Sequence, residues 1–131
     1  MCGIIAILGN RIGFKICMDG LKMLQNRGYD SSGVCSLSLD GKLVCDKFAS
    51  TESVSSIEKV EKCEVNHKDA TVLCMHTRWA THGGKTDENA HPHIDFQNKF
   101  ALVHNGIIEN YYELKQELIK NHNIKFDEVN I

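Results

Sequence analysis

The chain has 131 residues, of which 42% are hydrophobic and 24% charged, and its 15 basic and 17 acidic side chains leave a net charge of -2. This length suffices for one domain with a core, and the near-neutral balance offers no electrostatic footprint for nucleic acid or an anionic lipid surface. The longest apolar run, residues 4–8, is far shorter than the roughly 18 residues of a membrane helix, and residues 1–3 lack the basic flank of a signal peptide. We therefore expect a cytoplasmic protein that binds neither nucleic acid nor a membrane.

The first part of the chain predicts a strand followed by a helix. Residues 3–8 are rich in isoleucine and end at a Gly-Asn pair, which indicates a buried strand closed by a turn. Gly28 is a typical residue for the end of the helix that follows. Apolar side chains recur at helical spacing in this helix at Phe14, Cys17, Met18, Leu21 and Leu24.

The middle of the chain predicts a hairpin, a short helix and a third strand. Residues 33–48 alternate with period two on both sides of Asp40-Gly41, a pair typical of hairpin turns. Residues 52–66 have weak helical periodicity and predict a short surface helix. Residues 70–76 are apolar and β-branched, which indicates a strand.

The last part predicts a loop, a strand and an amphipathic helix. Residues 83–97 are polar, have no period and contain the only proline, whereas residues 100–103 form an apolar run. Asn110 and Glu113 are spaced like a capping box. The helical spacing continues through Ile107, Tyr111, Leu114 and Leu118. The order β-α-β-β-α-β-β-α predicts an α+β fold with layered or sandwiched sheets.

Six cysteines are spread along the chain without a C-x-x-C pair, and in a reducing cytosol most are expected to be small packing side chains. The four within apolar patterns are Cys17, Cys35, Cys45 and Cys74. Cys2 differs, because removal of Met1 would leave an N-terminal cysteine that combines a thiol nucleophile with an α-amine base of pKa ~7.7–8.0. Taken alone, a cysteine at position 2 is also explained by chance.

A second polar cluster, residues 76–83, follows the third predicted strand. Its Arg78 and Trp79 suit a small carboxylate or zwitterionic ligand, since a guanidinium offers a bidentate fork and an indole offers a flat wall. The alternative is a buried arginine bonded to backbone carbonyls beside a core tryptophan. These residues alone leave the two interpretations level.

Two further clusters lie at turns. Asn105 and Gly106 follow His104 at the end of a predicted strand and supply two hydrogen-bond donors, the minimum for an oxyanion hole, although the motif alone favours a plain Asn-Gly turn. Arg27 and Asp30 flank a glycine and are interpreted as an ion pair that supports the strand after Cys2. This role is structural.

Seven histidines raise the question of a metal site, chiefly His91 and His93 together with His76 or His82. Neither an H-E-x-x-H motif nor a Cys/His quartet is present, and the acidic side chains are not spaced for a site. We expect no metal and no cofactor.

Taken together, these motifs resemble the class II glutamine amidotransferase domain at the N-terminus of glucosamine-6-phosphate synthases. Amidophosphoribosyltransferase and asparagine synthetase share the N-terminal cysteine but are less similar around residues 78–83. The family's order and spacing are kept from the first residue to about residue 120. The matching segments are residues 2–9, 27–31 with Gly33, 76–83, 89–93 and 104–110.

The resemblance implies a four-layer α/β/β/α sandwich of the N-terminal-nucleophile hydrolase type, which releases ammonia from L-glutamine. It implies that Cys2 attacks the side-chain amide and that Asn105 and Gly106 stabilise the oxyanion. Arg78 is implied to hold the glutamine carboxylate. The residues implied to line its pocket are Trp79, Thr81, His82 and Gly83, and those implied to support the site are Arg27 and Asp30.

The match also has departures. In the family the last helix is followed by a Ser/Thr-rich segment whose aspartate receives the glutamine α-amino group; residues 126–131 lack it, and Asp127 is a poor substitute. Lys85 stands where the family usually has proline. Residues 1–131 are therefore interpreted as a partial glutamine amidotransferase domain without the sugar-phosphate isomerase domain, and the sandwich is expected to be incomplete at its C-terminal side.

Two hypotheses follow. The first is a glutaminase-type enzyme related to glucosamine-6-phosphate synthesis, favoured by the catalytic positions that are present. The second is a catalytically weak or inactive truncated pseudoenzyme that serves as a binding or assembly module, favoured by the missing aspartate and the missing half. An incomplete sandwich exposes apolar surface, so we expect a homodimer or a partner chain to cover it.

Overall fold

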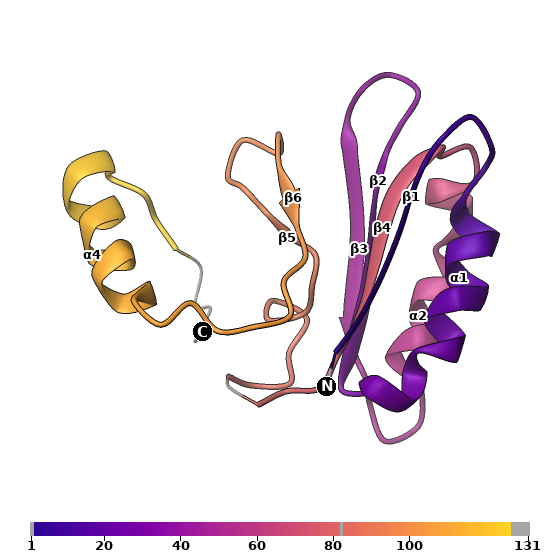
Figure 1. Ribbon diagram of the computed structural model, residues 1–131, viewed down its shortest axis with the longest axis horizontal. Coiled ribbons are helices and arrows are strands. Elements are labelled where there is room, and N and C mark those ends of the chain that lie inside the picture. Colours follow the sequence, from indigo (N-terminus) through magenta and orange to yellow (C-terminus); the bar gives the residue numbers. More distant parts are fainter. Residues whose placement is uncertain (1, 82, 127–131) are drawn as a thin grey trace.

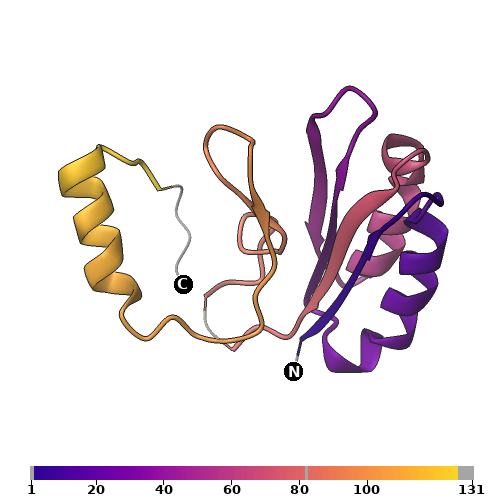
Figure 2. The same ribbon diagram turned by 45° about the horizontal axis from the view of Figure 1, so that its top comes forward.

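The computed structural model describes residues 2–81 and 83–126 and has a layered α+β architecture. Helices α1 (Phe14–Met23) and α2 (Ser56–Lys62) cover one face of a four-stranded sheet (Figure 1). A short two-stranded hairpin lies on the side of the other face, and helix α4 (Tyr111–His122) lies beyond that hairpin. Figure 2 shows the same succession of layers after rotation. The described residues thus follow the predicted α/β/β/α order.

Both sheets of the described residues are antiparallel, and the larger one has the strand order β1-β4-β2-β3. Its strands are β1 (Gly3–Leu8), β2 (Ser31–Leu37), β3 (Leu43–Ala49) and β4 (Val72–Arg78). The hairpin consists of β5 (His93–Ile94) and β6 (Ala101–Leu102). The register pairs Gly3 with Thr77, which brings Cys2 at the start of β1 beside the end of β4.

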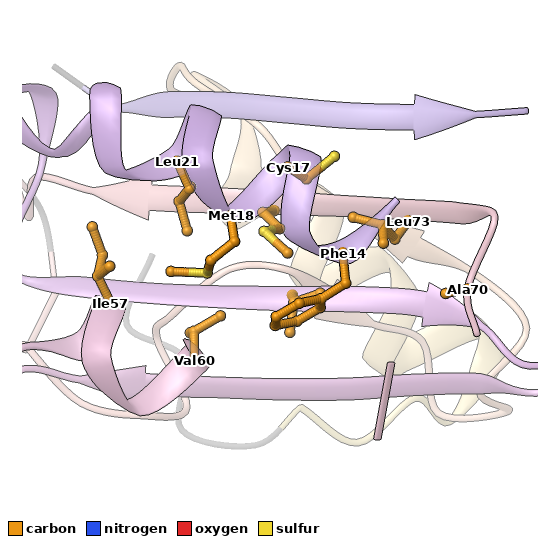
Figure 3. Close-up of a cluster of buried hydrophobic side chains, with 10 residues drawn as sticks. Phe14, Cys17, Met18, Leu21, Ile57, Val60, Ala70 and Leu73 are labelled. Atoms are coloured by element: carbon orange, nitrogen blue, oxygen red, sulfur yellow. The ribbon is translucent and has the colours of Figure 1, made fainter. Parts of the chain in front are cut away.

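The main core lies between the larger sheet and helices α1 and α2 (Figure 3). Because side chains alternate between the two faces of a strand, Val34 of β2 and Met75 of β4 point to this core and are fully buried. Leu21 of α1 and Val60 of α2 are fully buried in it, and the other helical members are Phe14, Cys17, Met18 and Ile57. The helical spacing predicted for residues 14–21 is confirmed.

Helix α1 ends earlier than the position of Gly28 predicts. The helix stops at Met23, and a 3-10 turn, η1 (Gln25–Arg27), separates it from Gly28. A Cβ at Gly28 would lie 2.6 Å from the carbonyl carbon of Arg78. Glycine is needed here because the backbone approaches β4 closely, not because it ends the helix.

The second half differs from the sequence prediction in three places. The helix expected over residues 52–66 is divided into α2 and α3 (Glu64–His67), which meet at Cys63. Strand β5 lies within the expected loop of residues 83–97. The capping box is not formed, because Asn110 has φ -96° and ψ 25° rather than an extended backbone and its side chain makes no cap hydrogen bond.

The C-terminal layers expose much apolar surface. No residue of helix α4 is buried in the described structure. Large apolar side chains that are at least 40% exposed on β6, on α4 and between them are Leu102, Ile107, Ile108, Tyr111, Tyr112, Leu114 and Ile119. The expected apolar surface is therefore present. Among the described residues, no helix combines the length and the hydropathy that crossing a membrane requires.

The loop that leads into β5 is held tightly on the larger sheet. A Cβ at Gly33 would collide with the carbonyl oxygen of His91 and would lie 2.6 Å from Lys47 Cβ. The Lys47 ammonium donates hydrogen bonds to the carbonyl oxygens of Glu88 and Ala90, both over 2.9 Å. Gly33 and Lys47 therefore hold the loop before β5 close to the larger sheet.

Replacing Gly33 with alanine is expected to lower the free energy of unfolding by about 1–3 kcal/mol, because the new methyl group overpacks the contact with His91. Urea denaturation followed by circular dichroism measures this change. Gly9→Ala is the matched control, since a Cβ at Gly9 meets nothing within 4 Å. Its stability should stay equal or rise by up to ~1 kcal/mol. Equal losses in both variants would contradict the layer contact.

Candidate functional site

Cys2 lies at the beginning of β1, next to the end of β4. The backbone N–H of Trp79 donates a hydrogen bond to Cys2 Sγ over 3.4 Å, and Sγ lies 3.8 Å from the carbonyl oxygen of Trp79. The N–H of Gly3 donates to Thr77 Oγ1 over 3.2 Å and holds the start of the strand. The Cys2 side chain is half-buried. The pairing of β1 with β4 therefore places the partly exposed sulfur of Cys2 beside the backbone N–H of Trp79.

Asn105 reaches the same point from the other layer. Its Nδ2 donates to the carbonyl oxygen of Cys2 over 3.1 Å, and its Oδ1 lies 2.8 Å from His76 Nε2. Gly106 follows Asn105 at the surface. The side chain of Asn105 is therefore more than part of an Asn-Gly turn, because it bridges the hairpin layer and the start of β1.

Arg78 and Trp79 lie where β4 leaves the sheet. The Arg78 guanidinium donates from Nη1 to the carbonyl oxygen of Gly84 over 3.0 Å, which ties the following loop to the strand end. The Trp79 ring meets the Tyr29 ring edge-on, with 5.3 Å between centroids. Trp79 is 41% exposed, so the alternative of a core tryptophan is wrong.

The other predicted pocket residues belong to the loop after β4. Thr81 and Gly83 are exposed, and Gly83 has a φ of 74°, in the left-handed region that favours glycine. His82 lies outside the described residues. The loop begins two residues after Trp79, and the hydrogen bond from Arg78 to Gly84 keeps it at the end of β4.

The predicted pair between Arg27 and Asp30 is not formed in the described structure. Asp30 is 6% exposed, and its carboxylate accepts hydrogen bonds from the Ala80 N–H over 2.8 Å and from the Lys85 ammonium over 2.6 Å. Arg27 lies on the exposed surface of η1. Asp30 thus holds the loop after β4 in place rather than pairing with Arg27. Its ion-pair partner is Lys85, the residue that departs from the family pattern.

The contacts of Asp30 work against the effect of its burial. Burial raises the pKa of this carboxyl, but the hydrogen bonds from Lys85 and Ala80, with the charges of Lys85 and Arg78, outweigh it and lower the pKa below its ordinary value. A carboxyl with a lowered folded pKa stabilises the fold above its unfolded pKa, ~3.9 for aspartate, and loses that effect as the pH falls through the folded pKa.

Lys85→Met should therefore raise the pKa of Asp30 and lower the melting temperature near neutral pH. The difference from the parent chain should begin to shrink as the pH falls below about 4 and vanish below the lowered folded pKa of Asp30, where this carboxyl is protonated in both. Thermal unfolding followed at several pH values measures it. Lys42→Met is the matched control, because its partner Asp40 has a side chain that is 58% exposed and the pair is screened by water. A difference between the parent and Lys85→Met that does not change with pH would contradict this account.

Three histidine rings, those of His76, His91 and His93, pack against one another behind Asn105. The ring centroids of His76 and His91 lie 4.4 Å apart, and those of His91 and His93 lie 4.3 Å apart. Burial lowers their pKa values to about 4, 3 and 4, so all three are neutral at pH 7. Within the described ranges, no group of three or more His, Cys, Asp or Glu side chains is arranged to hold a metal ion.

Two contributions to the site were missed from the sequence. The pairing of Lys85 with Asp30 had a signal, namely a lysine where the family usually has proline. The hydrogen bond between His76 and Asn105 joins residues 29 positions apart, and no local pattern indicates such a contact.

The comparisons with known proteins agree with this geometry. No family model matches the chain. It is 43% identical over 128 residues to a probable isomerizing glutamine--fructose-6-phosphate aminotransferase of Acanthamoeba polyphaga mimivirus, covering 96% of this chain and 21% of that protein. It is 47% identical over 126 residues to the corresponding Aquifex aeolicus enzyme, covering 96% of this chain and 20% of that protein. The chain thus spans about a fifth of the length of these curated relatives.

A solved structure is similar over almost the whole chain. The glutamine phosphoribosylpyrophosphate amidotransferase of B. subtilis superposes with a TM-score of 0.73 at 28% identity, covering 97% of this chain and 26% of that chain. The fold with its half-buried Cys2 is thus that of a glutamine amidotransferase domain of the N-terminal-nucleophile type. Within that class, the chain is a homologue of the glutamine amidotransferase part of isomerizing glutamine--fructose-6-phosphate aminotransferases.

Proposed function

We propose that the chain hydrolyses the side-chain amide of L-glutamine to glutamate and ammonia, with Cys2 as the nucleophile. The observation that supports this proposal is that Cys2 receives two hydrogen bonds, one from the Trp79 N–H to its thiol and one from the Asn105 side-chain amide to its carbonyl oxygen. Once Met1 is removed, the α-amine of Cys2, with a pKa of ~7.7–8.0, is partly neutral near pH 7 and accepts the thiol proton.

The reaction proceeds through a thioester. The Cys2 sulfur bonds to the amide carbon of glutamine while its proton passes to the α-amine, and the carbonyl oxygen becomes an oxyanion. Asn105 Nδ2 and the N–H of Gly106 are the proposed donors to that oxyanion. The carbon–nitrogen bond then breaks, and the leaving group takes the proton from the α-ammonium and departs as ammonia. Water hydrolyses the thioester, which releases glutamate and restores the thiol.

Glutamine binding is assigned to the end of β4 and the loop after it. The guanidinium of Arg78 holds the α-carboxylate, because an arginine fork matches the two oxygens of a carboxylate. Trp79 supplies an exposed wall beside Cys2. The remaining pocket residues are Thr81, His82 and Gly83.

The names of the relatives connect the ammonia to glucosamine-6-phosphate synthesis. We assign the reaction to the cytoplasm, because the Cys2 nucleophile must stay reduced and all six cysteines are free thiols. No metal and no other cofactor takes part in the proposed steps.

Incubation with a diazo-ketone analogue of glutamine tests this function. Intact mass and a peptide map should show loss of Met1 and one adduct, located at Cys2, and excess L-glutamine should protect against it. Glutamate release should be saturable in the unlabelled protein. A retained Met1, or labelling spread over the six cysteines, would reject the proposal.

The exposed apolar surface of β6 and α4 favours a second candidate, a non-catalytic binding or assembly module. We propose that a second copy of the chain, as a homodimer, covers this surface, and a partner chain is the alternative. Size-exclusion chromatography with light scattering should give the mass of a dimer that dissociates on dilution. A stable monomer at every concentration would reject self-association. Calorimetry that detects glutamine binding without glutamate release would favour the module over the enzyme.

A further inference from the structure

A buried histidine with no assigned role lies behind Asn105. His76 is on β4, is fully buried, and has its Nε2 2.8 Å from Asn105 Oδ1. An amide oxygen only accepts hydrogen bonds, so His76 Nε2 carries the hydrogen and donates it. The contact therefore defines both the tautomer of His76 and the end of the Asn105 amide that faces it.

The orientation of that amide decides what Asn105 presents to Cys2. With Oδ1 turned to His76, Nδ2 points to the carbonyl oxygen of Cys2 over 3.1 Å and keeps a second hydrogen for a ligand. Rotation of the amide by 180° would place Oδ1 against the Cys2 carbonyl oxygen, so that two acceptors would face each other. The same rotation would turn the only side-chain donor of Asn105 away from Cys2.

The surroundings of His76 keep it neutral and in place. Burial is the main cause that lowers its pKa, to about 4, and the charge of Arg78 acts in the same direction. A neutral imidazole has a single N–H, so a hydrogen on Nε2 leaves Nδ1 as an acceptor. His76 Nδ1 is buried without a hydrogen-bond partner in the described part of the chain, and the ring packs at a tilt against that of His91. The described contacts on the nitrogens of His76 thus come from Asn105.

We propose that His76 is a positioning residue for amide hydrolysis, whose Nε2–H holds the Asn105 amide with Nδ2 directed to Cys2 and the developing oxyanion. The proposal rests on the proposed glutaminase function. It assigns His76 no contact with glutamine. Its whole effect passes through Asn105, and this restriction can be tested.

Two substitutions of His76 separate positioning from packing. His76→Leu fills the buried position with an apolar side chain but removes the hydrogen-bond donor. The kcat for glutamate release should fall ~10- to 100-fold with little change in KM. This loss is smaller than the roughly 10²–10³-fold loss expected when an oxyanion donor is removed outright. His76→Gln places an amide N–H near the position of Nε2 and should restore most of the rate. Equal losses in both variants, or a change in KM alone, would overturn the proposal.

A double substitution tests whether His76 acts through Asn105. Asn105→Ala combined with His76→Leu should be no slower than Asn105→Ala alone, because residues that act through one contact are not additive. Additive losses would overturn the proposal. His67→Leu is the matched buried-histidine control: His67 is bonded to Ser36 over 2.7 Å and to Asp46 over 3.1 Å on the helix side of the sheet. It should lower stability and leave kcat of the folded protein unchanged.

A measurement that does not depend on catalysis, the protonation of the His76 ring nitrogens, separates this proposal from the glutaminase proposal. Nitrogen-15 NMR of the uniformly labelled full chain should show His76 protonated on Nε2 and not on Nδ1, and His76→Leu should shift the side-chain amide signals of Asn105. If the parent chain releases no glutamate, the proposed function fails, and the tautomer alone then decides whether His76 orients Asn105. An Nδ1–H tautomer would overturn the positioning role even in an active protein.

Discussion

Replacement of Cys2 by serine is expected to lower the rate of glutamate release by on the order of 10⁴-fold or more, the scale on which loss of a nucleophile acts in hydrolases. Serine is a much weaker nucleophile in this position, because its hydroxyl has a far higher pKa than a thiol and the α-amine of the N-terminal residue deprotonates it less readily. Glutamate release coupled to a dehydrogenase measures the rate, and circular dichroism verifies that the variant is folded. Labelling by the diazo-ketone analogue should be lost as well.

Cys45→Ser is the matched control for this prediction, because it tests whether loss of another thiol has the same effect. The hydrogen bond from the Cys35 thiol, together with the charge of Lys47, lowers the pKa of Cys45, so this half-buried thiol is the other candidate for modification. It lies on β3, separated from β1 by two strands. Cys45→Ser should keep the parent rate and the Cys2 adduct. A Cys2→Ser protein within tenfold of the parent rate, or an inactive Cys45→Ser protein, would refute the assignment of the nucleophile.

Asn105→Ala is expected to reduce kcat by about 10²–10³-fold while KM changes little, because an oxyanion donor acts mainly in the transition state. Truncation also removes the hydrogen bond to the Cys2 carbonyl oxygen, so some loss of order at the N-terminus accompanies it. Steady-state kinetics of glutamate release, normalised to folded protein, separates kcat from KM.

Asn66→Ala is the control for this truncation. The side chain of Asn66, on α3, donates to Asp46 of β3 over 2.8 Å, and β3 is separated from β1 by two strands. It should leave both kinetic constants unchanged. If Asn105→Ala loses less than about tenfold in kcat, or if only KM rises, the amide is not an oxyanion donor.

The elements of the N-terminal half could be predicted because their signals are local. Period-two alternation on both sides of Asp40-Gly41 predicts β2 and β3, and the helical spacing of Phe14 to Leu21 predicts α1. Each signal lies within one turn or a few residues. The helix end at Gly28 was wrong, because the close approach to β4 decides the backbone there. The capping box at Asn110 was wrong, because the backbone of Asn110 is not extended and its side chain makes no cap hydrogen bond.

The residues of the candidate site could be predicted from the sequence, but the contacts between them could not. The sequence motifs, with their family resemblance, led to Cys2, Arg78 and Asn105 as members of one site. The structure brings Cys2 and Asn105 into contact across 103 positions, a contact that depends on how the hairpin layer lies on the larger sheet. Gly33 and Lys47 set that placement, and neither has a chemical motif of its own.

The residue types needed for thiol chemistry, the α+β class and the near-neutral charge follow from the sequence by itself, since composition, periodicity and motif spacing are properties of the chain. Only the tertiary structure decided that Asp30 pairs with Lys85 rather than Arg27, and that His76 rather than solvent faces the Asn105 amide. The physical reason is that a buried polar group binds whichever partner the packing of distant segments brings within hydrogen-bond distance.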